Sequence, residues 1–230
     1  MKFNPKEILT ALSVKCKGSF DDMVAMIRRR ERLPDEEIAK CSDLSKNTIA
    51  IIDEDYPEVF KQIDCPPLVL FVKAGHRSLL DNVSSSGVAV FDDGGECGAG
   101  EIIHGLLENG KTIVVPNFED GSVLIEDKDH FLSVSEYPDG AYDESSREQK
   151  MRVERIAVGI CNTVLIGACK TFVKASAAAS LAMRAGKALK VVPMGNDKKD
   201  CINNTLLKNG ADIALTWEDV LPEQSDTAKA

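Results

Sequence analysis

Two lysines and a threonine stand where an α/β protein could bind an anion. Lys170, Thr171 and Lys174 follow the β-branched run at 163–166 and precede an alanine-rich segment at 175–185. The helix dipole favours anions at the start of a helix and disfavours cations there. Cations at this position are therefore explained if they contact a bound anion. An ordinary surface loop with solvated lysines explains the pattern equally well. The segment is a candidate phosphate contact, with a solvated loop as the alternative.

Two arginines in the preceding helical segment could grip a phosphate together. Arg152 and Arg155 are three residues apart, which places them on one face of a helix over 146–161. Glu148 and Glu154 are spaced to pair with them, and a salt-bridged, solvated face is the commoner outcome. The candidate residues for DNA or phosphate binding are thus Arg152, Arg155, Lys170, Thr171 and Lys174.

A glycine-rich loop follows the apolar run at 88–91 and precedes a helical pattern, as a phosphate-cradling loop would. It contains Gly94, Gly95 and Gly98, but the spacing is not G-x-G-x-x-G. Asp92, Asp93 and Glu96 in the same loop would repel a phosphate. We therefore favour a role of the glycines in the turn and in close helix packing.

A second run of cations ends a helix expected near the N-terminus. Residues 28–32 read Arg-Arg-Arg-Glu-Arg and follow apolar residues at the helical positions 20, 23, 24 and 27. Because cations are favoured at a helix C-terminus, we rate a solvated helix end above a contact with DNA.

No motif indicates catalysis. His104 lies among apolar residues of a helical pattern, and no serine or cysteine sits in a nucleophile-elbow motif. The seven cysteines are scattered without C-x-x-C, and the three histidines are dispersed. We expect free thiols, no metal or other cofactor, and no enzymatic activity.

The overall charge limits where a nucleic acid could bind. The 230 residues include 28 Lys and Arg against 37 Asp and Glu, and the net charge is −9. Such a chain repels phosphates at long range, so a nucleic-acid site must be a local basic patch. The apolar runs are too short to cross a bilayer, and no secretory signal is visible. We expect a cytoplasmic protein that does not enter a membrane.

The pattern of elements changes once along the chain. Asn4, Pro5 and Glu7 have the types and spacing of a helix start, and short helical patterns continue to about residue 46. From Thr48, short apolar strands alternate with helical segments, which predicts an α/β fold with a mostly parallel, doubly wound sheet. We expect a small helical N-terminal domain at 1–46, a connecting segment packed on the sheet domain at 47–87, the sheet domain at 88–221 and a disordered tail at 222–230.

Several segments between about residues 53 and 221 carry the motifs of one family. They are Asp53-Glu54-Asp55-Tyr56-Pro57, residues 63–73, residues 110–115, Ser135-Glu136-Tyr137-Pro138-Asp139-Gly140, residues 155–160, and Asn204-Thr205-Leu206-Leu207 with Gly210-Ala211 and Glu218-Asp219-Val220. In this order they resemble the DNA-processing protein DprA (Smf) family, whose own phrases include S-E-Y-P-P-G and R-I-I-A-G-L. The resemblance implies a Rossmann-like sheet domain.

The sequence also departs from that family. Its G-S-R phosphate loop is missing: either 88–90 is the preceding strand and Phe91-Asp92-Asp93 replaces the loop, or 98–115 with His104 matches a later G-I-D-x-x-A-H segment and one strand–helix unit is deleted. Its S-G-S-L is replaced by Val173-Lys174-Ala175-Ser176, and no winged-helix extension follows Ile213. The chain looks like a shortened, divergent member.

The resemblance implies a non-catalytic protein that binds single-stranded DNA and hands it to the RecA recombinase during natural transformation. It also implies a homodimer, to which the alanine-rich helix at 175–185 could contribute. Without the loop arginine we expect weaker DNA binding than in a full-length member. One alternative is a nucleotide-binding or N-ribohydrolase enzyme, because Gly94-Gly95-Glu96-Cys97-Gly98 with Glu101 is similar, with spacing off by one, to P-G-G-x-G-T-x-x-E. The other is a scaffold that has lost DNA binding.

Overall fold

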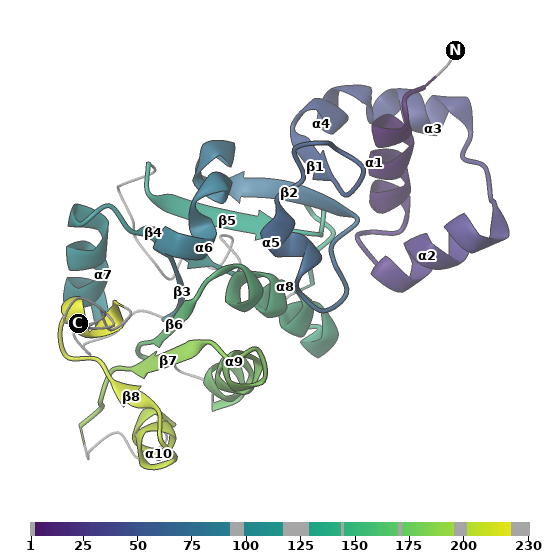
Figure 1. Ribbon diagram of the computed structural model, residues 1–230. Helices are drawn as coiled ribbons and strands as arrows, with labels where there is room; N and C mark the ends of the chain where they lie inside the picture. The colour runs from purple at the N-terminus through teal and green to yellow at the C-terminus, as the bar shows by residue number, and fades with distance from the viewer. Residues whose placement is uncertain are drawn as a thin grey trace, which may run out of the picture.

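The computed structural model describes residues 3–92, 99–116, 129–143, 145–169, 172–195 and 202–221, with side chains for all of them except Ala74 and residues 172–174. In this part of the chain, eight strands form one sheet of the order β1-β2-β5-β4-β3-β6-β7-β8 (Figure 1). The strands are β1 Thr48–Ala50, β2 Val69–Ala74, β3 Gly87–Phe91, β4 Thr112–Val115, β5 Phe131–Ser135, β6 Thr163–Ile166, β7 Ala188–Val191 and β8 Asp212–Ile213.

Six of these strands make a Rossmann arrangement. β5, β4, β3, β6, β7 and β8 are neighbours in this order and are all parallel, which is the strand order 3-2-1-4-5-6 of doubly wound folds. The α/β class and the mostly parallel, doubly wound sheet predicted from the sequence are confirmed. β2 adds to the β5 edge in antiparallel orientation, and β1 pairs antiparallel with β2.

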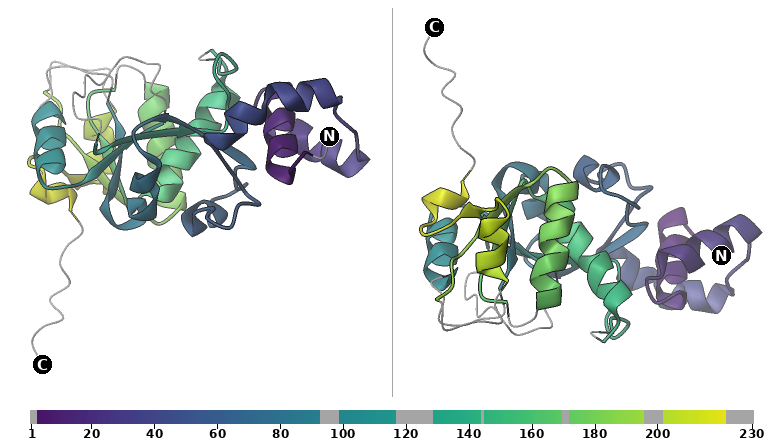
Figure 2. Two further views of the ribbon diagram at one scale, coloured as in Figure 1. Left: turned by 90° about the horizontal axis from the view of Figure 1, so that it is seen from above. Right: turned by 90° about the horizontal axis from the view of Figure 1, so that it is seen from below.

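Helices connect and cover the strands (Figure 2). They are α1 Pro5–Lys15, α2 Phe20–Arg29, α3 Asp35–Lys40, α4 Ser42–Lys46, α5 Glu58–Lys61, α6 Val83–Ser86, α7 Ala99–Glu108, α8 Arg147–Ile160, α9 Phe172–Arg184 and α10 Asn203–Lys208, with the 3₁₀ helices η1 Arg77–Asp81 and η2 Glu218–Val220. α8 and α9 lie side by side on one face of the sheet, and α7 lies on the other.

The N-terminal helices share a core with the antiparallel edge of the sheet. Asn4 caps α1 as expected, because its side chain accepts from Glu7 N–H and the Glu7 carboxylate accepts from Asn4 N–H. Residues from α1, α2 and α3 form one hydrophobic cluster with Val69 and Phe71 of β2. The helical segment is therefore held to the sheet by apolar contacts and not only by its linker.

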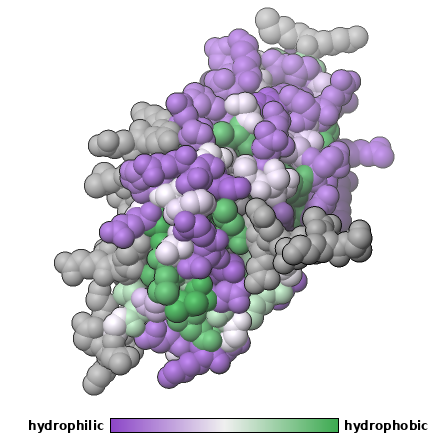
Figure 3. Space-filling model, turned by 60° about the vertical axis from the view of Figure 1, so that its left-hand side comes forward, coloured by the Kyte–Doolittle hydropathy of each residue, from purple (hydrophilic) through white to green (hydrophobic). Residues whose placement is uncertain are grey.

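The surface is mostly hydrophilic on the side that carries α7 and β8, with a larger hydrophobic patch in the lower half of the view and smaller ones above it (Figure 3). The exposed large hydrophobic residues at β8 and just after it are Ile213 and Leu215. No helix in the described part of the chain is long and apolar enough to span a membrane.

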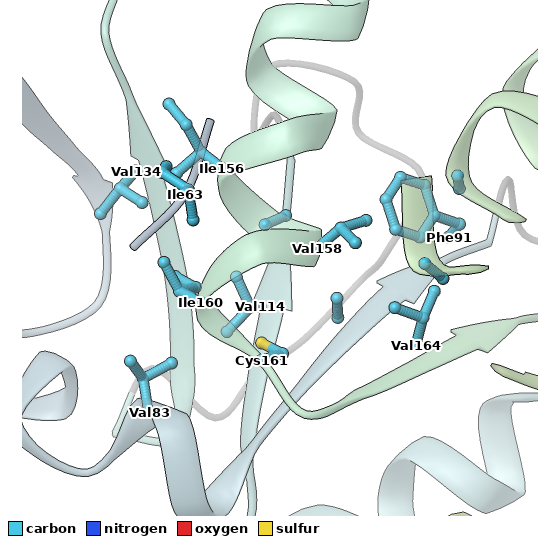
Figure 4. Packing of buried hydrophobic residues seen from close by; sticks show 14 of the residues in the cluster. Ile63, Val83, Phe91, Val114, Val134, Ile156, Val158, Ile160, Cys161 and Val164 are labelled. Atoms are coloured by element: carbon cyan, nitrogen blue, oxygen red, sulfur yellow. The ribbon is translucent and has the colours of Figure 1, made fainter. Parts of the chain in front are cut away.

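The main core lies between the sheet and the α8–α9 layer. Ala89, Phe91 and Val164 face it, whereas their neighbours Val88, Val90 and Leu165 face the core under α7, as the alternation of side chains along a strand requires. Figure 4 shows Ile156, Ile160 and Cys161 packed around Val114 and Val134, with Ile63 from the segment after α5 closing over them.

The thiols are mostly internal. Of the cysteines in the described ranges, Cys41, Cys161 and Cys169 are buried, Cys16 is half-buried and Cys65 is exposed. Cys16, Cys41, Cys65 and Cys161 are free thiols, as expected, and the Cys169 thiol donates to the Phe91 carbonyl at 3.3 Å. Burial raises the pKa of the Cys161 thiol, so it is an unreactive packing group. Cys97 and Cys201 lie outside the described residues.

Candidate nucleic-acid interface

The carboxyl ends of β3 and β6 form the point where the strand order of the sheet reverses. In doubly wound folds, ligands bind in the crevice at this point. β3 continues into Asp92, and β6 continues into Gly167, Ala168 and Cys169. These two loops are the natural place to look for a phosphate contact.

A buried carboxylate lies at this switch point. Asp92 is 9% exposed, and its Oδ1 accepts the Ala168 N–H at 2.7 Å. A second hydrogen bond joins the ends of β3 and β6, because Gly167 N–H donates to the Phe91 carbonyl at 2.9 Å. A Cβ at position 167 would lie 2.7 Å from Asp92 Oδ1, so glycine is required for the close approach. The Ala168 amide is therefore used internally and is not offered to a bound anion.

Two asparagines fix the neighbouring loop ends. Asn203, fully buried, donates from its side-chain amide to the carbonyls of Gly167 at 2.8 Å and Val192 at 2.7 Å. Asn204 accepts from Met194 N–H at 3.2 Å and donates to the Met194 carbonyl at 2.8 Å. The carboxyl ends of β3, β6 and β7 are thus tied into one rigid edge.

The sequence-derived candidates at this edge are placed only in part. Lys174 lies in the first turn of α9, which starts from the β6 loop, and this turn belongs to the carboxyl edge of the sheet. Lys170, Thr171 and the loop glycines Gly94, Gly95 and Gly98 lie outside the described residues. Their proximity to a bound strand stays a prediction.

Arg155, the second arginine candidate, is anchored inside the protein. Its Nε donates to the Asp64 carbonyl at 3.1 Å, and its Nη2 donates to the Cys65 carbonyl at 2.6 Å and to Glu136 Oε2 at 3.1 Å. The Arg155 side chain is only 13% exposed and that of Glu136 only 4%. Arg155 therefore joins α8 to the loop after α5 and to the end of β5.

Arg152 joins α8 to the N-terminal helices. Its Nη2 lies 2.8 Å from Asp21 Oδ2 on α2, and its Nε donates to Glu148 Oε1 at 3.2 Å. The pairing with Glu148 agrees with the spacing in the sequence. The structure thus brings Arg152 and Arg155 together on α8 but gives both of them partners within the chain, and a contact of either with DNA stays a prediction.

The Ser-Glu-Tyr-Pro segment lies beside these arginines. Burial raises the pKa of Glu136 above its ordinary value, and the attraction of the Arg155 guanidinium opposes this rise. Burial also raises the pKa of Tyr137, and the α1–α2 turn packs against both residues, since a Cβ on Gly18 would lie 2.6 Å from the Glu136 carbonyl oxygen. The segment is a structural junction of three parts of the chain.

Two other cations of α8 are free at its N-terminal end. Arg147 and Lys150 are exposed, and neither has an ion-pair partner within the described ranges. α8 connects the carboxyl end of β5 to the amino end of β6, so its first turns lie at the same sheet edge as the start of α9. The spacing in the sequence favoured Arg152 and Arg155 of this helix instead. The helical period does not separate the two pairs, because Lys150 lies three residues before the buried Val153 and thus near the core-facing side of α8.

A hollow lies along α7, on the face of the sheet opposite α8 and α9. It has a volume of about 520 Å³ and is lined by Gly100, Glu101, His104, Gly105, Glu108 and Trp217. His104 Nδ1 lies 3.4 Å from Glu108 Oε1, both side chains being exposed. Glu101, the residue of the N-ribohydrolase alternative, points to no partner that would activate it among the described residues. That part of the chain also contains no group of three His, Cys, Asp or Glu residues that could hold a metal ion.

The sheet order, the switch-point crevice and the helical N-terminal segment define a Rossmann-like α/β protein. No family model matches the sequence, and no curated protein matches it in sequence. Among solved structures, the fold is similar to that of DNA processing protein A (DprA) from Streptococcus pneumoniae, with a TM-score of 0.59 and 18% identity over 96% of this chain and 98% of the other. It is also similar to DprA from Helicobacter pylori, described for its single-stranded DNA binding mode, with a TM-score of 0.57 and 19% identity over 75% of this chain and 93% of the other. The chain has the DprA-like fold that the sequence motifs predicted.

Proposed function

We propose that this protein binds single-stranded DNA at the carboxyl edge of its Rossmann sheet, without catalysis, and acts as a DprA-like protein in recombination. The observation that carries the proposal is the likeness of fold to the H. pylori protein, which binds single-stranded DNA. The placement of Lys174, Arg147 and Lys150 at one sheet edge supports it.

The mode of contact follows from the chemistry of that edge. Because the Ala168 amide is already bonded to Asp92, we propose that side chains make the contacts. They are Arg147 and Lys150 of α8 and Lys174 of α9, together with Lys170 and Thr171, which lie outside the described residues. Arg152 and Arg155 would join these contacts only by exchanging their bonds to Asp21, Glu148 and Glu136 for a phosphate. Contacts of this kind read the phosphate backbone and not the base sequence.

The test is the anisotropy of a labelled oligo-dT of about thirty nucleotides, titrated at two salt concentrations. We expect salt-sensitive binding that is weakened roughly tenfold in the triple variant Arg147→Ala, Lys150→Ala, Lys174→Ala. The slope of log affinity against log salt should fall by about 2, because each single-strand phosphate contact contributes about 0.7.

The matched control removes the same charge from the amino edge of the sheet. Lys111 precedes β4, while Arg184 and Lys208 end α9 and α10. Their triple alanine variant should bind like the wild type. Equal effects of the two triple variants would show a general loss of charge instead of a site, and no binding by the wild type would favour the scaffold alternative.

The finer parts of the proposal are a RecA partner and a homodimer. The dimer does not use the alanine-rich face of α9 as its contact, because Ala175, Ala178 and Ala182 are fully buried in the main core. Light scattering at micromolar concentration should give twice the chain mass, and RecA should be retained by the immobilised full chain when single-stranded DNA is present.

A further inference from the structure

The arginine cluster at the end of α2 stands out from the acidic surface of this protein. Arg28, Arg29, Arg30 and Arg32 are all exposed. In the described ranges the only ion pair among them joins Arg29 to Glu31 at 3.5 Å, with 73% and 43% of the two side chains exposed. Such a long, exposed pair neutralises little charge. Four guanidinium groups therefore face solvent within five residues, although the whole chain carries a net charge of −9.

The helix dipole and the helix end explain only part of this cluster. Arg28 and Arg29 lie in the last turn of α2, where the helix dipole favours cations. Arg30 and Arg32 lie beyond the helix and gain little from the dipole, which acts within the last turn. Arg30 also has a φ of 55° in the left-handed region, where glycine would end the helix at lower cost. A capping function alone would not place an arginine there.

The start of α2 fixes the position of the cluster on the molecule. Asp21, in the first turn of α2, is bound to Arg152 of α8 at 2.8 Å. From there α2 leads away from the sheet (Figure 1), and its ten residues span about 15 Å. The arginines thus lie at the outer end of a helix whose inner end touches the helix that carries Arg147 and Lys150.

We infer that Arg28, Arg30 and Arg32, with Arg29, form a second phosphate-binding surface that holds single-stranded DNA extending beyond the carboxyl edge of the sheet. This inference rests on the proposed function and adds a separate site to it. Guanidinium groups suit the partner because they bind phosphate oxygens in a bidentate manner and are weakly hydrated. Ile27, 49% exposed beside them, offers apolar surface to an unstacked base.

The test uses the full chain and the labelled oligo-dT of about thirty nucleotides. The variant Arg28→Ala, Arg30→Ala, Arg32→Ala keeps Arg29 with Glu31 and removes only exposed side chains, so its melting temperature should fall by no more than a few degrees, from the loss of the Arg28 charge at the end of α2. We expect roughly tenfold weaker binding at low salt and a salt slope lower by about 2. The amino-edge variant of Lys111, Arg184 and Lys208, with the same change of charge, should show neither effect.

The outcomes separate this site from the one at the sheet edge. If the arginine variant binds like the wild type while the variant of Arg147, Lys150 and Lys174 is weakened, the second surface is overturned and the proposed function stands. If only the arginine variant is weakened, the second surface stands and the sheet-edge site falls. If the wild type does not bind the oligonucleotide, both are wrong. If the arginine variant loses binding to anionic lipid vesicles but not to DNA, the cluster serves a membrane surface and the inference is overturned.

Discussion

At the scale of single residues, the motifs that signalled the family have structural roles in this chain. Tyr56 donates its hydroxyl to the Pro67 carbonyl at 2.8 Å, and Asp53 accepts from Lys6 at 2.7 Å. Asp219 accepts the N–H groups of Leu215 and Thr216, and Glu136 is held by Arg155. Contacts of this kind explain why the motifs predicted the fold.

Arg155→Ala should destabilise the fold. The change leaves Glu136 buried without its counter-charge and leaves the Asp64 and Cys65 carbonyls without a donor. Breaking a buried pair by removing one partner costs about 3–5 kcal/mol. We expect a loss of this size in the free energy of unfolding at pH 7, measured with urea, whereas Arg147→Ala on the same helix should change it by less than about 0.5 kcal/mol.

The same variant has a defined pH dependence. Arg155 lowers the pKa of Glu136 against the effect of burial, so its removal raises that pKa further above the ordinary value. A carboxyl group with a raised pKa in the folded state destabilises the fold while ionised, and this cost is lost as the pH falls through that pKa. The difference between Arg155→Ala and the wild type should therefore shrink from pH 7 to pH 5. A difference that is independent of pH would show that Glu136 is not involved.

At the scale of elements, the packing of α7 depends on a glycine, because any side chain at that position would collide with its neighbour. Gly105 lies under Trp217, and a Cβ built on it would lie 2.4 Å from Trp217 Cδ1 and 3.0 Å from Trp217 Cβ. Gly100, in the same helix, has no atom within 4 Å of such a Cβ. Propensity alone would rank alanine above glycine at both positions.

Gly105→Ala should therefore destabilise the protein by about 1–3 kcal/mol, as overpacking does, while Gly100→Ala should stabilise it by up to about 1 kcal/mol. Trp217 is the only tryptophan, so its fluorescence reports directly on this contact. We expect a red-shifted emission in Gly105→Ala and an unchanged emission in Gly100→Ala. Equal stabilisation by both changes would mean that Trp217 moves aside freely.

At the scale of the whole molecule, the helical N-terminal segment and the sheet share surfaces. Val69 and Phe71 of β2, 1% and 6% exposed, are covered by the cluster formed with α1, α2 and α3. Thr10 of α1 and Thr48 of β1 are hydrogen-bonded through their hydroxyls, with 3.2 Å between the two oxygens. Asp21 of α2 forms an ion pair with Arg152 of α8.

Deletion of residues 1–46 should uncover this apolar surface. Exposing two large side chains costs about 1.5–3 kcal/mol each, so the shortened chain should unfold at a lower temperature and bind a hydrophobic dye that the full chain does not bind. A shortened chain with an unchanged melting temperature and no dye binding would show that the helical segment is an independent domain.

The sequence by itself determined the class of the fold, the type of most elements and the absence of a whole-protein basic field, because these depend on local periodicity, caps and composition. It also indicated that cations of α8 and of the segment after β6 are candidate phosphate contacts. It could not tell Arg152 and Arg155 from Arg147 and Lys150, since their partners Asp21, Asp64, Cys65 and Glu136 are brought to α8 only by the packing of distant segments. The tertiary structure also decided that Asp92 is buried at the switch point, where it accepts the Ala168 N–H, and that the arginines at the end of α2 are exposed. Which cations are free for a partner depends on long-range contacts, and these exist only in the folded chain.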